Sequence, residues 1–314
     1  MSTVHNDRTC IICNPAAGAG SAARKWERFE RQLRQQGWSG DCSTTERPSQ
    51  ATELTAARIR EGYRRIAVFG GDGTLNEVLQ GAVSREGRPP RDLQLVFLAA
   101  GSSCDFEKAF RERTPLASRL FSGQSHLVDI GKVECRDFDG RPQVRYFLNN
   151  SSIGVISLGT QKFNHAKGFH LALKRLNMDA AAIAIGLSAI AEYPVIKAEL
   201  ILDEVEALDI RLSNLTVFKA PYFAGGMYLG ARTELDDGIL NVALIHATSR
   251  LKLARMIPSL YTGNIFRHQA AQHRQCRSLV LNTEQTVFVE TDGEIIGHPP
   301  ARYTIIPQAI QIVI

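Results

Sequence analysis

The residues with the clearest chemical potential lie in the segment 70–77, which reads Gly-Gly-Asp-Gly-Thr-Leu-Asn-Glu. Glycines let a backbone approach a phosphate closely and adopt φ angles that other residues avoid. The start of a helix offers unpaired N–H groups and the positive end of a dipole to an anion. Asp72 adds a carboxylate able to hold Mg²⁺, directly or through water, or to accept a proton. The segment therefore predicts a phosphate-binding turn between a strand and a helix.

Strand-like and helix-like runs alternate through the first 130 residues. Short apolar runs lie at 9–13, 65–69 and 95–99, with a further strand expected near 38–44. Helical segments are expected over 21–36, 50–61 and 74–83. This alternation is typical of a parallel sheet with helices on both faces. It predicts a doubly wound α/β domain over residues 1–129, which contains the expected phosphate-binding turn.

The pattern of apolar residues changes after Asp129. From there on, short runs rich in Val, Ile, Leu and Phe are separated by turns such as Asp139-Gly140. This pattern is typical of an antiparallel sandwich or barrel. Helices over 169–192 and 249–261 are expected to interrupt it. We predict a β-sandwich-like second domain over 130–302, with residues 303–314 forming a strand that returns to the first domain. A cleft between two domains is the default place for chemistry.

Composition is consistent with a soluble two-domain enzyme. The chain has 314 residues, of which 44% are hydrophobic and 22% are charged. Its net charge of +5 is too small to indicate nucleic-acid binding and suits phosphate-rich ligands or an anionic membrane surface. The longest apolar helical candidate, Ala180 to Ala191, is far shorter than the roughly 20 residues of a membrane span. We find no secretion signal at the start of the chain and expect a cytoplasmic location.

The cysteines do not indicate a metal site. Cys10 and Cys13 lie three residues apart in an expected strand, where their side chains point to opposite faces. We interpret the six cysteines of the chain as packing residues.

Several segments together resemble the diacylglycerol kinase catalytic-domain family, which includes sphingosine and ceramide kinases and bacterial lipid kinases. The string at 70–78 resembles its phosphate-binding motif, and Asn14 to Gly20 resembles its first loop, Asn-Pro-x-x-Gly. Gly225-Gly226-Met227 with 235–242, and then Thr291 to Glu294, resemble two motifs of its second domain. These motifs occur in the family's order over roughly residues 9–314.

The resemblance implies an ATP-dependent and Mg²⁺-dependent transferase that phosphorylates the hydroxyl of a lipid, such as diacylglycerol or a sphingoid base, in phospholipid biosynthesis. Thr45 matches a nucleotide-contacting threonine of the family, although Thr44 could fill that position instead. By resemblance, the nucleotide-binding residues are Asn14, Thr45, Gly70, Gly71, Asp72, Gly73, Thr74, Leu75, Asn76, Glu77, Gly101 and Ser102.

The resemblance also assigns catalytic and metal-binding roles. Glu294 and Asp72 compete as the acceptor of the substrate's proton; we favour Glu294, with Asp72 organising Mg²⁺ and the γ-phosphate. Glu234, Asp237 and the carbonyl oxygen of Ile239 match a second metal position that the bacterial members hold away from the nucleotide. Oxygen ligands of this kind suit Mg²⁺.

One loop departs from the family pattern. Where the family has Pro-x-Gly-Thr-x-Asn-Asp-Phe, residues 99–106 read Ala-Ala-Gly-Ser-Ser-Cys-Asp-Phe. Cys104 replaces an asparagine and removes an amide that forms strong hydrogen bonds. This change leaves the nucleotide preference open and motivates a second hypothesis, a non-catalytic nucleotide sensor.

The Gly-Gly-Asp-Gly element is shared with NAD kinases, but the remaining motifs argue against that class. A kinase of a soluble small-molecule alcohol on the same fold is left open, as is a homodimer. Ser249 to Tyr261 is a basic amphipathic segment that either seats the protein on the inner face of an anionic membrane or simply faces solvent.

Overall fold

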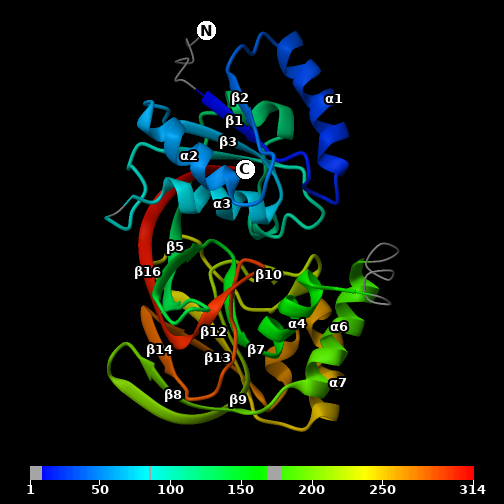
Figure 1. Cartoon of the computed structure of the whole chain (residues 1–314), viewed down its shortest axis with the longest axis vertical. Helices are drawn as coiled ribbons and strands as arrows, with labels where there is room; N and C mark the ends of the chain where they lie inside the picture. Colours follow the sequence, from blue (N-terminus) through cyan, green and yellow to red (C-terminus); the bar gives the residue numbers. More distant parts are fainter. Residues whose placement is uncertain (1–8, 85, 168–177) are drawn as a thin grey trace. The chain divides into compact units, whose positions relative to one another are not determined.

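The computed structural model describes residues 9–84, 86–167 and 178–314. The chain forms two compact units, shown in Figure 1. The first unit extends to Ile130 and includes Ile306–Ile314, and the second comprises Gly131–Ile305. We describe each unit by itself.

A parallel sheet forms the centre of the first unit. Its strands are β1 (Thr9–Cys13), β2 (Asp41–Thr44), β3 (Arg65–Gly70), β4 (Gln94–Ala99) and the end of β16 (Glu294–Val313). Their order is β16-β4-β3-β1-β2, and every neighbouring pair is parallel. The central strands are buried along nearly their whole length, because a parallel sheet is covered on both faces.

Helices α1 (Ser21–Gln35), α2 (Gln50–Arg60) and α3 (Asp72–Ala82) cover this sheet (Figure 1). Helix α1 buries Phe29 and Leu33 against one face, where Phe29 stacks on Phe69 with ring centroids 5.4 Å apart. Helices α2 and α3 pack closely at Gly81, where a Cβ atom would lie 2.2 Å from the Thr52 carbonyl oxygen. Two short 3₁₀ helices follow, η1 (Phe106–Ala109) and η2 (Leu116–Phe121).

The second unit is mainly antiparallel. Its strands follow the order β13-β12-β9-β7-β15-β16, and β14, β8, β5 and β6 pair alongside. Their bounds are β5 (His126–Arg136), β6 (Pro142–Phe147), β7 (Asn150–Gly154), β8 (Ile196–Leu202), β9 (Glu206–Phe218), β12 (Leu240–His246), β13 (Ala271–Cys276), β14 (Ser278–Asn282) and β15 (Val289–Thr291). A separate small hairpin joins β10 (Tyr222–Phe223) to β11 (Met227–Tyr228).

Three helices belong to the second unit: α4 (Val155–Asn164), α6 (Met178–Glu192) and α7 (Arg250–Thr262), with the short η3 (Ile265–Arg267). Ser249 caps α7 by accepting the Lys252 backbone N–H, and the helix ends at Gly263, where φ is +66°. Helix α4 was not expected from the sequence. The first part of the helix expected over 169–192 lies outside the described residues, and α6 covers the remainder.

The predicted fold class, an α/β domain followed by a β-rich domain, is confirmed. Among the described helices, none is both long enough and apolar enough to span a membrane.

Candidate functional site

Four loops of the first unit follow directly on parallel strands. Asn14 comes after β1, Thr45 after β2, Gly71 after β3, and Gly101 two residues after the end of β4. We call the loops at Asn14, Gly71 and Gly101 the first, second and third loops. The carboxyl ends of parallel strands lie at one edge of a sheet, which is where ligands bind in open α/β folds. The structure therefore brings these predicted nucleotide-binding loops to one edge.

Asn14 connects the first loop to the start of α3. Its side-chain amide donates to Thr74 Oγ1 at 3.0 Å, and its Oδ1 accepts the Ala16 N–H at 3.0 Å. Its backbone N–H donates to the Phe69 carbonyl, and the Thr45 N–H donates to the Cys13 carbonyl, both at 2.9 Å. The visible role of Asn14 is to fix the shape of the first loop against the second.

Glycines allow the second and third loops to touch. A Cβ atom on Gly101 would lie 2.5 Å from the Gly71 Cα, and one on Gly70 would lie 2.5 Å from Thr74 Oγ1. The Ala100 N–H donates to the Gly70 carbonyl at 2.7 Å. A side chain at Gly101 would therefore push the two loops apart, and one at Gly70 would collide with Thr74 in the first turn of α3.

Asp72 joins the start of α3 to the start of η1. Its Oδ2 accepts the Asp105 N–H at 2.8 Å, and its Oδ1 accepts the Phe106 N–H at 3.0 Å. Burial raises the pKa of the Asp72 carboxyl above its usual value, although the N–H groups of Phe106 and Asp105 oppose that shift. Each oxygen keeps a further lone pair, so the carboxylate can hold the third loop and still face a cation.

Most of the side chains after Gly73 point into the fold. Thr74, Leu75 and Asn76 are buried, and the Asn76 Oδ1 accepts a hydrogen bond from Gln80. Glu77 accepts the N–H groups of Ser49 and Ala51 at 3.0 and 3.1 Å, and thereby caps the start of α2.

Backbone donors remain at the start of α3. Because the helix begins at Asp72, the N–H groups of residues 72–74 have no acceptor one turn earlier within it. Gly73 and Ser102 are exposed, and nothing lies within 4 Å of where a Gly73 Cβ would be. These groups can bind an anion at this edge of the sheet.

Lys25 is a cation that sequence reasoning did not assign to this site. It lies in the first turns of α1, and its Nζ donates to the Ala100 carbonyl at 3.0 Å, next to Gly101. Its position near the third loop depends on how α1 packs on the sheet, which the spacing from Gly20 does not reveal.

Cys104 lies in the same loop with a φ of +47°, in the left-handed region that Asn tolerates better than Cys. Burial raises the pKa of the Cys104 thiol to about 12, so the sulfur stays protonated and unreactive near neutral pH.

In the second unit, Asp292 organises the turn that contains Glu294. The Asp292 carboxylate accepts three backbone N–H groups, from Leu148, Asn149 and Asn150, at 3.0 to 3.1 Å. Its own N–H donates to the Asn150 carbonyl at 2.9 Å, and its φ is +46°. Asp292 therefore binds the turn to the segment before β7.

Glu290 supports the same turn from inside the unit, although sequence reasoning did not single it out. Its side chain is buried, and its Oε1 accepts the Gly293 N–H at 2.6 Å. Burial raises the pKa of Glu290 to about 8. The Gly293 carbonyl accepts a hydrogen bond from Asn164 of α4 at 2.9 Å. These contacts fix a turn at whose end Glu294 is exposed.

Two of the three groups of the second predicted metal position bind a lysine. Lys219 Nζ donates to Asp237 Oδ1 at 2.7 Å and to the Ile239 carbonyl at 2.8 Å. The Glu234 side chain is 61% exposed and lies 3.5 Å from Arg232. Within residues 9–84, 86–167 and 178–314, no three His, Cys, Asp or Glu side chains gather in a metal-binding group.

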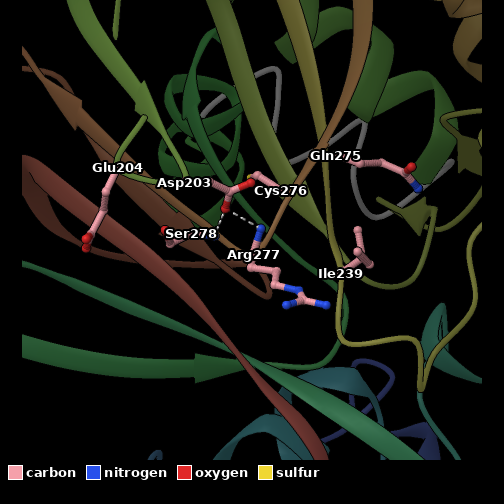
Figure 2. A pocket seen from close by; sticks show the side chains of 7 residues that line it. All are labelled: Asp203, Glu204, Ile239, Gln275, Cys276, Arg277 and Ser278. Atoms are coloured by element: carbon pink, nitrogen blue, oxygen red, sulfur yellow. Dashed lines mark hydrogen bonds between the residues drawn. The ribbon is translucent and has the colours of Figure 1, made fainter. Parts of the chain in front are cut away.

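A separate open pocket of about 570 Å³ lies in the second unit (Figure 2). Within its lining, the Asp203 carboxylate accepts the backbone N–H groups of Arg277 and Ser278 at 2.7 and 2.9 Å. Of the predicted site residues, Ile239 alone is among its lining residues, which are Asp203, Glu204, Ile239, Gln275, Cys276, Arg277 and Ser278.

Two family models match consecutive parts of the chain. The model of the diacylglycerol kinase catalytic domain matches residues 8–133. The model of the YegS C-terminal NAD kinase beta sandwich-like domain matches residues 154–314, which is more than half of the chain. The chain belongs to the bacterial diacylglycerol kinase-like family.

Individual relatives extend over nearly the whole length of this family member. It is 24% identical to a diacylglycerol kinase of Staphylococcus saprophyticus over 97% of this chain and 94% of the relative. It is 23% identical to a diacylglycerol kinase of Mycobacterium tuberculosis over the same shares of the two chains.

Two crystal structures of Bacillus anthracis proteins show the same fold. One aligns with a TM-score of 0.75 at 20% identity and covers 98% of this chain and 97% of the other. The second, a diacylglycerol kinase, aligns with a TM-score of 0.70 at 19% identity and covers 99% and 98%.

Proposed function

We propose that this protein transfers the γ-phosphoryl group of ATP to the hydroxyl of a lipid, such as diacylglycerol or a sphingoid base. The observation that carries the proposal is the convergence of four strand-end loops at one sheet edge, with Asp72 bonded to the third loop, in a chain of the diacylglycerol kinase-like family. Phosphoryl transfer requires mainly positioning and charge neutralisation, which such loops can provide.

The first unit binds the nucleotide in this proposal. The N–H groups of residues 72–74 and the Ser102 hydroxyl contact phosphate oxygens, and Gly101 lets the third loop approach them closely. Lys25 supplies a positive charge close to the third loop. Mg²⁺ would be held by the remaining lone pairs of Asp72 together with the phosphates, and it would neutralise phosphate charge.

Glu294 is the proton acceptor in this proposal. Its side chain is exposed at the end of a turn that Asp292 and Glu290 fix, which suits a group that must meet a substrate hydroxyl. Asp72 is less suited to that role, because each of its oxygens already accepts a backbone N–H. Asp72 instead positions the third loop and the cation.

We further propose that α7 contacts an anionic membrane, where a lipid substrate resides. Arg250, Lys252 and Arg255 are exposed on this helix, and Leu251 between them is 61% exposed. Basic side chains beside an exposed apolar residue are typical of helices that lie on anionic membranes. Sedimentation with phosphatidylglycerol vesicles should fall on R250E/K252E, whereas R28E/R31E on α1 should leave it unchanged. Equal sedimentation of both variants would exclude α7 as the contact.

ADP release in the presence of ATP and Mg²⁺ distinguishes the candidate functions. Turnover that depends on mixed micelles of diacylglycerol or sphingosine supports the lipid kinase. Turnover with a soluble alcohol alone favours a small-molecule kinase. Tight ATP binding without turnover favours a nucleotide sensor, which the replacement of the family's asparagine by Cys104 motivates.

A further inference from the structure

Lys219 is a charged residue in the interior of the second unit. It follows directly on β9, and its side chain is 1% exposed. Its backbone N–H donates to the Asn149 carbonyl at 2.8 Å, which continues the pairing beyond the end of the strand. A buried ammonium group is stable only where oxygen atoms surround it.

Two of those oxygens belong to the turn after Asp236. Lys219 Nζ lies 2.7 Å from Asp237 Oδ1 and 2.8 Å from the Ile239 carbonyl oxygen. The same Asp237 oxygen accepts the Ile239 N–H at 3.0 Å. The ammonium group thus closes the turn by binding its side chain and its backbone together.

These oxygens are two of the three groups that the family resemblance assigns to a second Mg²⁺. The third group, the Glu234 carboxylate, is 61% exposed and lies 3.5 Å from Arg232. The two oxygens expected to bind a metal ion, Asp237 Oδ1 and the Ile239 carbonyl oxygen, therefore bind the Lys219 ammonium group.

The ammonium group and Mg²⁺ are mutually exclusive at this position. Mg²⁺ requires octahedral oxygen ligands at about 2.0–2.1 Å. Here Asp237 Oδ1 already accepts two donors, Lys219 Nζ and the Ile239 N–H, and the ammonium group lies within hydrogen-bonding distance of both Asp237 Oδ1 and the Ile239 carbonyl oxygen, where the metal ion would have to sit. Distances of 2.7 and 2.8 Å are those of charge-assisted hydrogen bonds. A divalent cation beside the buried ammonium would also face electrostatic repulsion without added negative charge.

We propose that Lys219 replaces the metal ion at this position and holds the turn 237–239 with its own positive charge. The protein then keeps this turn closed without a divalent cation, and any Mg²⁺ requirement arises with the nucleotide. The replacement concerns the second unit by itself and does not depend on which reaction the protein catalyses.

Metal binding without nucleotide tests the replacement. Binding of Mn²⁺, followed by electron paramagnetic resonance, is compared between wild type and D237N, and melting temperatures are measured in Mg²⁺ and in EDTA. Wild type should show no Asp237-dependent Mn²⁺ binding, and its melting temperature should be the same in both solutions. Stoichiometric Mn²⁺ binding to wild type that D237N abolishes would overturn the proposal.

Removing the Lys219 ammonium group is a second test of the proposal, because it should restore metal binding. K219A leaves the two oxygens facing a space that a hydrated cation can enter, so it should bind Mn²⁺. Its melting temperature in EDTA should fall by roughly 3–10 °C and recover in part with Mg²⁺. Adding D237N should abolish that recovery.

K162A provides the matched control, because Lys162 pairs with Glu192 at 2.6 Å near the surface. This variant should show no response to Mg²⁺. If K219A does not fold, K219M keeps the aliphatic volume without the charge and should be less stable than wild type in EDTA. A folded K219A that binds no Mn²⁺, or a K219M as stable as wild type, would contradict the replacement.

Discussion

The carboxyl group of Glu290 accepts the backbone N–H of Gly293 at 2.6 Å, one residue before Glu294. Because Glu290 is fully buried, its pKa is raised to about 8, and the side chain is protonated near neutral pH. A neutral acid inside the second unit therefore supports the turn that presents the proposed proton acceptor. Deprotonation of Glu290 would place an unneutralised charge in the interior.

Protein stability should decrease as pH rises through the neutral range. Between the ordinary glutamate value of 4.5 and about 8, the folded state keeps a proton on Glu290 that the unfolded state has lost. The free energy of unfolding should therefore fall with increasing pH, by at most about 1.4 kcal/mol per pH unit, and level off above the folded-state pKa. Denaturant unfolding from pH 5 to pH 9 measures this slope.

E290Q removes the titrating group and should flatten the pH dependence over that range. E294Q changes a nearby exposed carboxylate and should keep the wild-type slope. If E290Q and wild type lose stability with pH in parallel, burial of Glu290 is not the cause.

Substitutions of Asp292 and Glu294, which lie in one turn, should have different effects: the first should lower stability, and the second should lower activity. D292A removes the acceptor of three backbone N–H groups and should lower the free energy of unfolding by about 2–4 kcal/mol. E294Q should change stability by less than about 0.5 kcal/mol, because its side chain is exposed, and yet abolish phosphoryl transfer. Unfolding curves and turnover rates of both variants check this. Substantial activity in E294Q would exclude Glu294 as the proton acceptor.

Asp72 should matter for nucleotide affinity through the third loop. In D72N, an amide N–H₂ must face one of the backbone N–H groups of Asp105 and Phe106, so one contact becomes repulsive. We expect a loss of about 1–3 kcal/mol in stability and weaker ATP binding by calorimetry. D92N changes an exposed carboxylate 3.2 Å from Arg64 and serves as the control. Equal ATP affinity in D72N and D92N would contradict this role.

Lys25 lies outside the family motifs, and its substitution tests whether the nucleotide binds at the sheet edge where the loops converge. Removing its charge in K25M should weaken ATP binding by roughly 5- to 30-fold, because a cation beside the third loop is lost. The neighbouring R24M alters another exposed cation of the same helix and should bind ATP like wild type. If both variants bind ATP equally well, Lys25 does not contact the phosphates.

The fold class was predictable because its signals are local. The buried run at 65–69, the glycines after it and the periodic helix that follows are adjacent in the sequence, and β3 and α3 form there. The helix begins at Asp72, two residues before the expected start, because the glycine-rich segment itself enters the first turn. Helix α4 was missed because Val155–Asn164 contains β-branched residues and a glycine, which favour helix weakly without tertiary packing.

The environments of Lys219 and Glu290 were not predictable, because segments that are far apart in the sequence form them. Lys219 reaches Asp237 only because β9 ends beside the turn before β12, and single-sequence patterns carry no such pairing. Glu290 resembles an ordinary surface glutamate in the sequence, and its burial depends on β15 lying between β7 and β16. Motif residues indicated the proposed chemistry, whereas the residues that hold those motifs in place required the structure.

The most direct test of the proposed function is transfer of labelled γ-phosphate from ATP to diacylglycerol or sphingosine in mixed micelles. Purified wild type is compared with E294Q under conditions where both proteins are folded and bind ATP. We predict a labelled phospholipid with wild type and at least a roughly 100-fold lower rate with E294Q. A wild-type protein that binds ATP but labels neither lipid would contradict the assignment of these acceptors.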